Sequence, residues 1–156
     1  MAANFTIRTA IESDQPVIKD LIHEAGINPL GLHWSRFLVA ANQEGTVVGC
    51  GQVKPHRDGS RELASLAVAR DWRRRGVAGE IIRALQQKHE APLWLTCMDQ
   101  LVSFYQPFGF VRIESAAEMP AYFRRIFRLF KLFQAVTRVK GQLALMVWHS
   151  KRGNNL

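Results

Sequence analysis

The pattern of apolar and polar positions predicts a chain that mixes strands with helices. Short alternating or wholly apolar runs predict seven strands, over Phe5–Thr9, Phe37–Ala41, Thr46–Val53, Leu63–Val68, Pro92–Cys97, Phe110–Ile113 and Gln142–Trp148. Helical spacing of apolar residues predicts helices after Pro16, after Gly76, over Leu101–Phe108 and over about 120–138. Ile27 to Trp34 lacks a regular period and is typical of a loop or a short helix. We therefore expect an α/β fold (an α+β mixed sheet) with helices that flank a central, mostly antiparallel sheet.

The stretch from Glu62 to Leu85 joins a buried strand to a helix through a basic turn. After Leu63–Val68 come Arg-Asp-Trp-Arg-Arg-Arg-Gly, and the helix then places Val77, Ile81 and Leu85 on one side. A strand that passes through a glycine-containing loop into a helix directs several unpaired backbone N–H groups at one point, where the helix dipole also favours negative charge. The stretch therefore predicts an anion site, and specifically one for phosphate.

Length and composition predict a single globular domain. The chain has 156 residues, 47% of them hydrophobic and 22% charged, which is enough to bury a core without disulfides. The N-terminus lacks the pattern of a signal peptide, and no apolar run is long enough to cross a membrane. Cys50 and Cys97 lie in strand-like runs without metal-binding spacing, so we expect buried, reduced thiols in a cytoplasmic protein.

The positive charge is confined to the end of the chain. Residues 1–118 contain 13 Lys/Arg and 13 Asp/Glu, whereas residues 119–156 contain 8 Lys/Arg and no acid, so the whole net charge of +8 comes from the last quarter. An even basic coat, as expected of a nucleic-acid-binding protein, is absent.

Two motifs resemble those of the GNAT superfamily of acetyltransferases. Arg73-Arg74-Arg75-Gly76-Val77-Ala78 is similar to the (Gln/Arg)-x-x-Gly-x-(Gly/Ala) signature, and Phe104-Tyr105-Gln106-Pro107-Phe108-Gly109-Phe110 is similar to the Phe-Tyr-x-x-x-Gly-Phe segment. The predicted order of elements also agrees with the family over about residues 5 to 149. The resemblance implies one GNAT-like acyl-CoA N-acyltransferase domain over 1–150, with a basic amphipathic insertion at about 116–141 and a disordered tail at 151–156.

The resemblance also implies acetyl-CoA as cosubstrate. Carried over to this chain, the cofactor-binding residues are Leu66, Ala67, Val68, Arg73, Arg74, Arg75, Gly76, Val77, Ala78 and Gly79. The loop would hold the diphosphate through backbone N–H groups, since Gly76 permits close approach. The backbone of Leu66 and Val68 would pair with the amides of the pantetheine arm. Arg73 has an alternative role, which is to orient the loop.

Two residues are the expected catalytic groups of an N-acetyltransferase. By resemblance, Tyr105 would protonate the departing thiolate, and its alternative role is to pack beside Phe104 and Phe108. Glu62 stands where many relatives carry a glutamate base that deprotonates the amine, and His56 could serve the same end; a chain of water molecules could replace both. His33, His89 and His149 do not gather with acids or cysteines, so we expect no metal site.

The basic segment near the C-terminus leaves three interpretations open. Its apolar residues could cover the sheet or the acceptor end, form a homodimer contact, or lie on an anionic membrane or nucleic acid. We favour the first and expect neither nucleic acid nor a membrane as partner. The sequence thus predicts acetyl transfer to a primary amine of a small molecule or peptide. The alternatives are a non-catalytic acyl-CoA sensor and a nucleic-acid or membrane binder.

Overall fold

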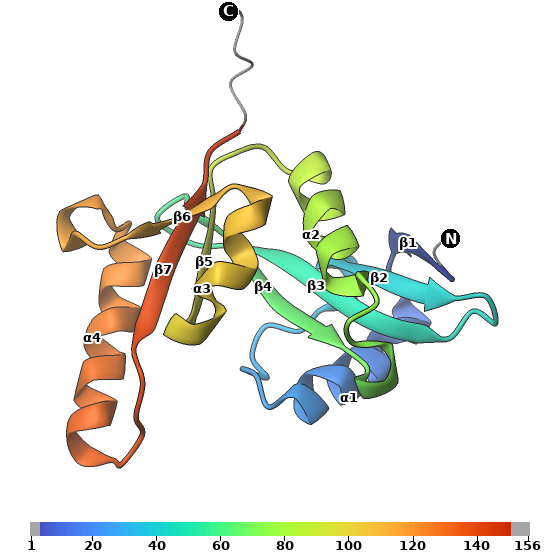
Figure 1. Ribbon diagram of the computed structural model, residues 1–156, viewed down its shortest axis with the longest axis horizontal. Helices are drawn as coiled ribbons and strands as arrows, with labels where there is room; N and C mark the ends of the chain where they lie inside the picture. The colour runs from blue at the N-terminus through green and yellow to red at the C-terminus, as the bar shows by residue number, and fades with distance from the viewer. Residues whose placement is uncertain (1–3, 151–156) are drawn as a thin grey trace, which may run out of the picture. The chain divides into compact units, whose positions relative to one another are not determined.

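Seven strands and four α-helices occur in residues 4–150, the part of the chain that this computed structural model describes (Figure 1). The strands are β1 (Phe5–Thr9), β2 (Phe37–Asn42), β3 (Val47–Pro55), β4 (Arg61–Val68), β5 (Leu93–Met98), β6 (Phe110–Ile113) and β7 (Leu143–Trp148). The helices are α1 (Gln15–Ala25), α2 (Val77–Lys88), α3 (Val102–Tyr105) and α4 (Ala121–Val136). The predicted tail, 151–156, lies outside the described residues.

The chain divides into two compact units, and β4 contributes to both. The first unit contains the chain up to Lys54 together with Leu63–His89, and the second contains Pro55–Glu62 and the chain from Glu90 onward. Within the first unit the strand order is β1-β2-β3-β4; within the second, Glu62 pairs in parallel with Trp94, and β5-β7-β6 follow. The β1–β2, β2–β3, β5–β7 and β6–β7 pairs are antiparallel. The expected mixed, mostly antiparallel sheet with flanking helices is confirmed.

In the first unit, α1 and α2 cover opposite faces of β2 and β3. Val39 pairs with Cys50, and the next pair is Ala40 with Gly49, so alternate pairs point to opposite sides of the sheet. Val39 and Cys50 pack in one core cluster with Ile18 and Ile22 of α1, and all four side chains are fully buried. The α1 prediction is confirmed, including its end at Gly26, which adopts the left-handed conformation.

On the other face, two glycines of β3 let α2 approach the strand closely. A Cβ at Gly49 would lie 2.8 Å from Cγ1 of Val77, and one at Gly51 would lie 2.8 Å from Cγ2 of Ile81. Such contacts are far below van der Waals distance, so larger residues would push α2 away. The glycines therefore fix where α2 begins, and with it the position of the basic loop that precedes it.

In the second unit, α4 lies beside β7 (Figure 1). Phe123 in the first turn of α4 is fully buried, as is Leu145 of β7. The predicted helix over Leu101–Phe108 is broken into three parts: a 3₁₀ turn at Asp99–Leu101, α3, and a 3₁₀ turn at Gln106–Phe108. Pro107 explains the break, because proline cannot continue an α-helix past its first turn.

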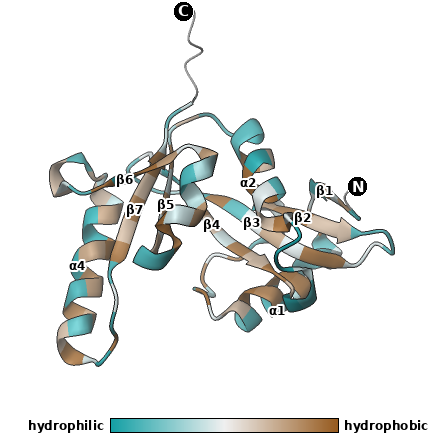
Figure 2. Ribbon diagram, in the orientation of Figure 1, coloured by the Kyte–Doolittle hydropathy of each residue, from teal (hydrophilic) through white to brown (hydrophobic). Residues whose placement is uncertain are grey.

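The apolar residues of α4 do not form the single covered stripe that the sequence suggests. Four of them are exposed by half or more at helical spacing, namely Leu129 (56%), Leu132 (65%), Phe133 (50%) and Val136 (82%). Brown and teal residues alternate along the visible side of α4 in Figure 2. Apolar residues are thus spread around the helix. Among the residues of α4 only Phe123, in the first turn, is fully buried, so this turn makes the closest contact with the rest of the second unit.

Candidate active site

The basic loop between β4 and α2 has the backbone conformation of an anion site. A 3₁₀ turn at Arg70–Trp72 follows β4, Arg74 adopts a φ of 62°, and Gly76 adopts a φ of 81° at the N-cap of α2. The first N–H groups of a helix have no partner inside it, and no side chain caps this helix. Consecutive residues in right- and left-handed conformations turn such N–H groups toward one concave surface, which suits a phosphate.

Two of the four arginines in the loop hold its shape. Nε of Arg73 donates a hydrogen bond of 3.1 Å to the carbonyl of Val68, which ties the loop to the end of β4. The guanidinium of Arg75 lies 4.9 Å from the ring centroid of Trp72, a cation–π contact. A Cβ at Gly76 would meet nothing within 4 Å, so the space in front of this backbone is open to a ligand. The residues present therefore fit a diphosphate held mainly by backbone N–H groups.

A second feature of the first unit, which the sequence did not reveal, is an irregularity in β4 at Ser65. Ser65 has a φ of 55°, a value that interrupts a regular strand. Gln52 of β3, fully buried, donates hydrogen bonds to Oγ of Ser65 (2.8 Å) and to the carbonyl of Gly31 (3.1 Å). Oε1 of Gln52 accepts a bond of 3.2 Å from Nε of Arg36. This buried glutamine thus fixes the irregular strand and the 27–34 loop to each other.

In the second unit, the two residues considered as alternative bases lie in contact. Nε2 of His56 and Oε2 of Glu62 are 2.8 Å apart, and the two side chains are 11% and 12% exposed. The other carboxylate oxygen of Glu62 accepts a longer bond of 3.4 Å from the hydroxyl of Thr96. His56 directly follows β3 and Glu62 is the second residue of β4, so the turn between the two strands brings the side chains together. Such a pair can accept a proton at one group and stabilise the charge with the other.

The start of α4 covers this pair with aromatic rings. The ring of Tyr122 stacks on His56 with centroids 3.5 Å apart and an interplanar angle of 14°. Phe123 contacts His56 edge to face and also packs on Trp94, which pairs with Glu62 in the sheet. Burial, followed by the charges of Glu62 and Asp58, raises the pKa of Tyr122. The sequence identified α4 as amphipathic but gave no sign that its first turn would reach these residues.

Asp58, in the turn between His56 and Glu62, anchors α4. Its Oδ2 accepts a hydrogen bond of 2.9 Å from the backbone N–H of Tyr122. The hydroxyl of Ser60, and then this N–H, lower the pKa of Asp58 to about 2. A lowered pKa means that the contribution to stability is present above the ordinary value near 3.8 and is lost as the pH falls through about 2. The anchor is therefore expected to persist throughout the neutral and mildly acidic range.

Replacing Asp58 by alanine is expected to loosen the first turn of α4. The loss of an acceptor at a helix start costs about 1 kcal/mol, and the exposure of Asp58 places the effect at or below that value. Amide hydrogen exchange should accelerate at Tyr122, while Asp58→Asn, which keeps an acceptor oxygen, should retain most of the protection. Equal exchange at Tyr122 in the alanine variant and the unchanged protein would show that Asp58 does not hold the helix.

Tyr105 lies in a different part of the second unit. It is the last residue of α3, and its ring contacts Phe104 and Phe110 edge to face. Burial, with a smaller effect from Cys97, raises the pKa of Tyr105 to about 12. The phenol therefore stays protonated at neutral pH and keeps an O–H group that can donate a hydrogen bond. Both cysteines are free and buried, as expected.

The predicted site residues are thus divided between the two units. The loop from Arg73 to Gly79 and the strand residues Leu66–Val68 belong to the first unit, and Glu62 and Tyr105 belong to the second. His33 contacts Ser35 through Nδ1 at 2.7 Å, which is a local contact. Within residues 4–150, no three His, Cys, Asp or Glu side chains gather in a way that could hold a metal ion.

A comparison with family models identifies the family of this chain. The model described as an acetyltransferase (GNAT) domain matches residues 33–112, about half of the chain, including β4, the basic loop and α2. The chain belongs to the GNAT acetyltransferase family. No curated protein sequence matches this GNAT protein. Across the described residues, no helix of the GNAT protein is both long enough and apolar enough to span a membrane.

Solved structures share the GNAT fold. N-acetylglutamate synthase from Neisseria gonorrhoeae, complexed with coenzyme A and N-acetyl-glutamate, has 21% identity and a TM-score of 0.68, over 96% of this chain and 36% of that one. Rv2747 from Mycobacterium tuberculosis, in complex with CoA, has 22% identity and a TM-score of 0.69, over 92% and 98%. The ribosomal-protein-S18-alanine N-acetyltransferase from Escherichia coli has 18% identity and a TM-score of 0.65, over 97% and 98%. The chain spans about a third of the length of the gonococcal synthase, and at these identities the likeness concerns the fold.

Proposed function

We propose that this GNAT protein transfers the acetyl group of acetyl-CoA to a primary amine by direct attack in a ternary complex. The observation that carries the proposal is the hydrogen-bonded pair of His56 and Glu62, nearly buried under the rings of Tyr122 and Phe123. An amine with a pKa near 10 is protonated at neutral pH and cannot attack until a base removes its proton. A shielded carboxylate in contact with an imidazole is suited to that task.

The cosubstrate is assigned to the first unit. Backbone N–H groups at the start of α2, from Gly76 to Gly79, bind the diphosphate, and the side chains of Arg73 and Arg75 keep the loop in shape. The backbone of Leu66, Ala67 and Val68, just after the irregularity at Ser65, pairs with the pantetheine amides. Bound acetyl-CoA supplies an acyl group activated as a thioester. Support comes from two solved structures of similar fold, which are complexes with coenzyme A.

In the transfer, Glu62 accepts a proton from the amine and His56 stabilises the pair. The neutral amine nitrogen then bonds to the acetyl carbon, the carbon–sulfur bond breaks, and the nitrogen loses its second proton to solvent to give the neutral amide. A phenol with a pKa of about 12 is a weaker acid than a thiol with a pKa near 8.5, so complete proton transfer to the sulfur is uphill. Tyr105 therefore acts by donating a hydrogen bond to the departing sulfur, and the proton that the thiol finally carries is exchanged with solvent.

Replacing Tyr105 by phenylalanine is expected to lower kcat by about 100-fold and to leave the KM for acetyl-CoA nearly unchanged, because one donor in the transition state is lost. Since the pKa of Tyr105 is about 12, its ionisation should not lower the rate of the unchanged enzyme between pH 7 and about pH 10. Steady-state kinetics over this range measure both effects. A variant as active as the unchanged enzyme would show that Tyr105 only packs beside Phe104 and Phe110.

The acceptor is proposed to be an amine of a small molecule or peptide. The names of two neighbours in fold concern such amines: one is an N-acetylglutamate synthase and the other acetylates an alanine of ribosomal protein S18. At 18–21% identity the likeness concerns the fold, so the proposal of an amine acceptor depends on the shielded base formed by His56 and Glu62.

A panel assay tests the proposal. The protein is incubated with acetyl-, propionyl- or succinyl-CoA and a panel of amino acids, polyamines, aminosugars and short peptides, and free thiol is measured. We expect release that requires both an amine and acetyl-CoA. A second measurement, titration calorimetry with acetyl-CoA, separates the alternatives. Tight binding of acetyl-CoA without thiol release for any amine would identify an acyl-CoA sensor instead. Faster thiol release with propionyl- or succinyl-CoA would show that the acyl donor is not acetyl-CoA.

A further inference from the structure

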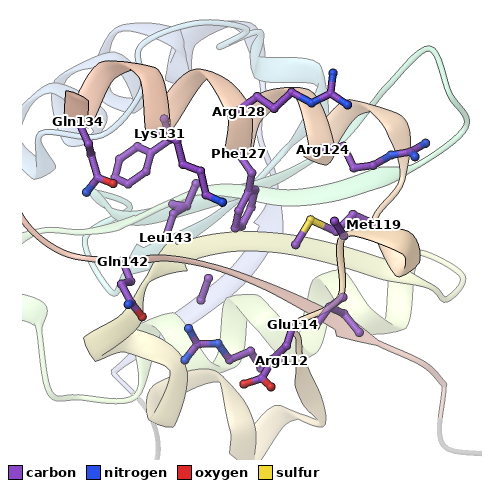
Figure 3. Close-up of a pocket in the computed structure, with 14 residues that line it drawn as sticks. Arg112, Glu114, Met119, Arg124, Phe127, Arg128, Lys131, Gln134, Gln142 and Leu143 are labelled. Atoms are coloured by element: carbon purple, nitrogen blue, oxygen red, sulfur yellow. The ribbon is translucent and has the colours of Figure 1, made fainter. Parts of the chain in front are cut away.

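A cavity of about 540 Å³ lies in the second unit between α4 and the strands β6 and β7 (Figure 3). A volume of this size is typical of sites for small molecules. Neither His56, Glu62 nor Tyr105 lines it. The cavity is therefore distinct from the residues to which the acetyl transfer is assigned.

The walls of the cavity carry an excess of positive charge. Its charged lining residues are four cations, Arg112, Arg124, Arg128 and Lys131, and one acid, Glu114. Arg112 of β6 pairs with Asp99 at 2.5 Å, so part of its charge is already balanced. Among the described residues, no carboxylate lies within ion-pair distance of Arg124, Arg128 or Lys131. Three cations on one side of α4 thus remain to attract an anion.

The arrangement of side chains separates a charged wall from an apolar floor. In Figure 3, Lys131 and the ring of Phe127 point from α4 toward Leu143 of β7, whereas the guanidinium groups of Arg124 and Arg128 extend to one side, away from Lys131. Leu143 and Ala144 of β7 form the opposite apolar surface. Since a free phosphate would gain nothing from that surface, the cavity suits a ligand that joins an anionic group to an apolar body.

A hydrogen bond holds the end of α4 that lies beside the cavity. Nε2 of Gln134, on the last turns of α4, donates to the carbonyl of Gly141 at 2.6 Å, which ties the helix to the segment before β7. At the other end, Asp58 anchors the first turn of α4. Both ends of the helix are fixed within the second unit, so the cavity is a formed feature of that unit and not a gap beside a loose helix.

We propose that this cavity binds a small amphiphilic anion, a carboxylate, phosphate or sulfonate on an apolar body. The charged group lies at the ammonium group of Lys131, with Arg124 and Arg128 adding positive charge nearby, and the apolar body lies on Phe127 and Leu143. Binding requires no chemical step and is independent of acetyl transfer, so it is tested without an activity assay.

The test uses 8-anilinonaphthalene-1-sulfonate, an aromatic sulfonate, and its uncharged analogue N-phenyl-1-naphthylamine. The full chain is titrated with each, and binding is followed by fluorescence. We expect the sulfonate to bind at one site and at least about 10-fold more tightly than the uncharged analogue. Lys131→Glu should lower the affinity for the sulfonate by about 10-fold. Arg125→Glu makes the same change of charge on the same helix at a residue that does not line the cavity, so it should retain the affinity within about twofold.

Circular dichroism of each variant shows whether it folds, and methyl signals locate the probe in the unchanged protein. Signals of Leu143 should shift, while those of Leu132, on the exposed side of α4, should not. The proposal is overturned if the uncharged analogue binds as well as the sulfonate, if both charge variants lose affinity equally, or if the shifts occur at Leu132 instead. It is also overturned if the unchanged protein binds neither probe.

Discussion

Replacing Gly76 by valine is expected to weaken the binding of coenzyme A by about 100-fold. Gly76 adopts a φ of +81°, and a side chain there would project into open space in front of the loop. That is the space in which the proposed diphosphate meets the N–H groups of α2. The loss of two charge-assisted hydrogen bonds is worth about 3 kcal/mol, which corresponds to roughly 100-fold in the dissociation constant.

The strain of a β-branched residue at positive φ is a separate effect, and Gly45 provides the control. Gly45 has a φ of +82°, and a Cβ there would also meet nothing within 4 Å, but it lies in the turn between β2 and β3. Gly45→Val should therefore cost about the same stability, of the order of 1–2 kcal/mol, and leave the affinity for coenzyme A unchanged. Titration calorimetry measures the affinities, and thermal unfolding measures the stabilities.

Two results would count against the loop as the diphosphate site. One is equal affinity for coenzyme A in Gly76→Val and the unchanged protein. The other is a parallel loss in both glycine variants, which would attribute the effect to instability rather than to the loop. Either result would leave the family membership intact, since that rests on residues 33–112 as a whole.

The strand, loop and helix around Gly76 could be predicted because each is specified by nearby residues. The buried β4, the helical spacing of Val77, Ile81 and Leu85, and the glycine at the junction are all local signals. The close packing of α2 on Gly49 and Gly51 could not be predicted in the same way, because the spacing of apolar residues along the sequence does not give the distance between a strand and a helix. Local periodicity thus accounts for the elements and for the part of the candidate site that consists of backbone.

The side-chain part of the candidate site depends on contacts between distant residues. His56 and Glu62 were separate candidates, and their contact could have been inferred from the short turn that joins their strands. The stacking of Tyr122 on His56 spans a sequence separation of more than sixty residues, and no pattern in either segment indicates it. The hydrogen bonds from Gln52 to Gly31 and Ser65 could not be predicted either. In the sequence, a glutamine that will be buried cannot be distinguished from any other polar residue in a strand.

The prediction for the helix α4 is confirmed for the element and for its exposed basic residues, but it is wrong for a single covered apolar side. Its apolar residues suggested one covered side and a basic side in solvent. In the structure, Phe127 and three of the basic residues line one cavity, whereas Leu132 and Val136 are exposed. A helix with apolar residues on more than one side has no unique buried side, so its contacts are decided by the anchor at Asp58 and by the burial of Phe123.

Replacing Glu62 by glutamine is expected to lower kcat at pH 7 by 100-fold to 1,000-fold, which is within the range of a lost general base. Glutamine keeps the size of the side chain and its contact with His56, but its amide cannot accept the proton of an ammonium group. Steady-state kinetics with the best acceptor from the panel measure the loss. Glu24→Gln, which makes the same change at an exposed position on α1, should behave like the unchanged enzyme.

The pH dependence of the glutamine variant distinguishes a base from a structural residue. Without the carboxylate, only the neutral fraction of the amine reacts, and this fraction rises about 10-fold per pH unit below a pKa near 10.4. The rate of Glu62→Gln should therefore climb with that slope from pH 7 to pH 10 and approach the rate of the unchanged enzyme, whose dependence is flatter. A variant that stays equally slow at every pH would mean that Glu62 positions the acceptor or supports His56, and the base would then have to be another group.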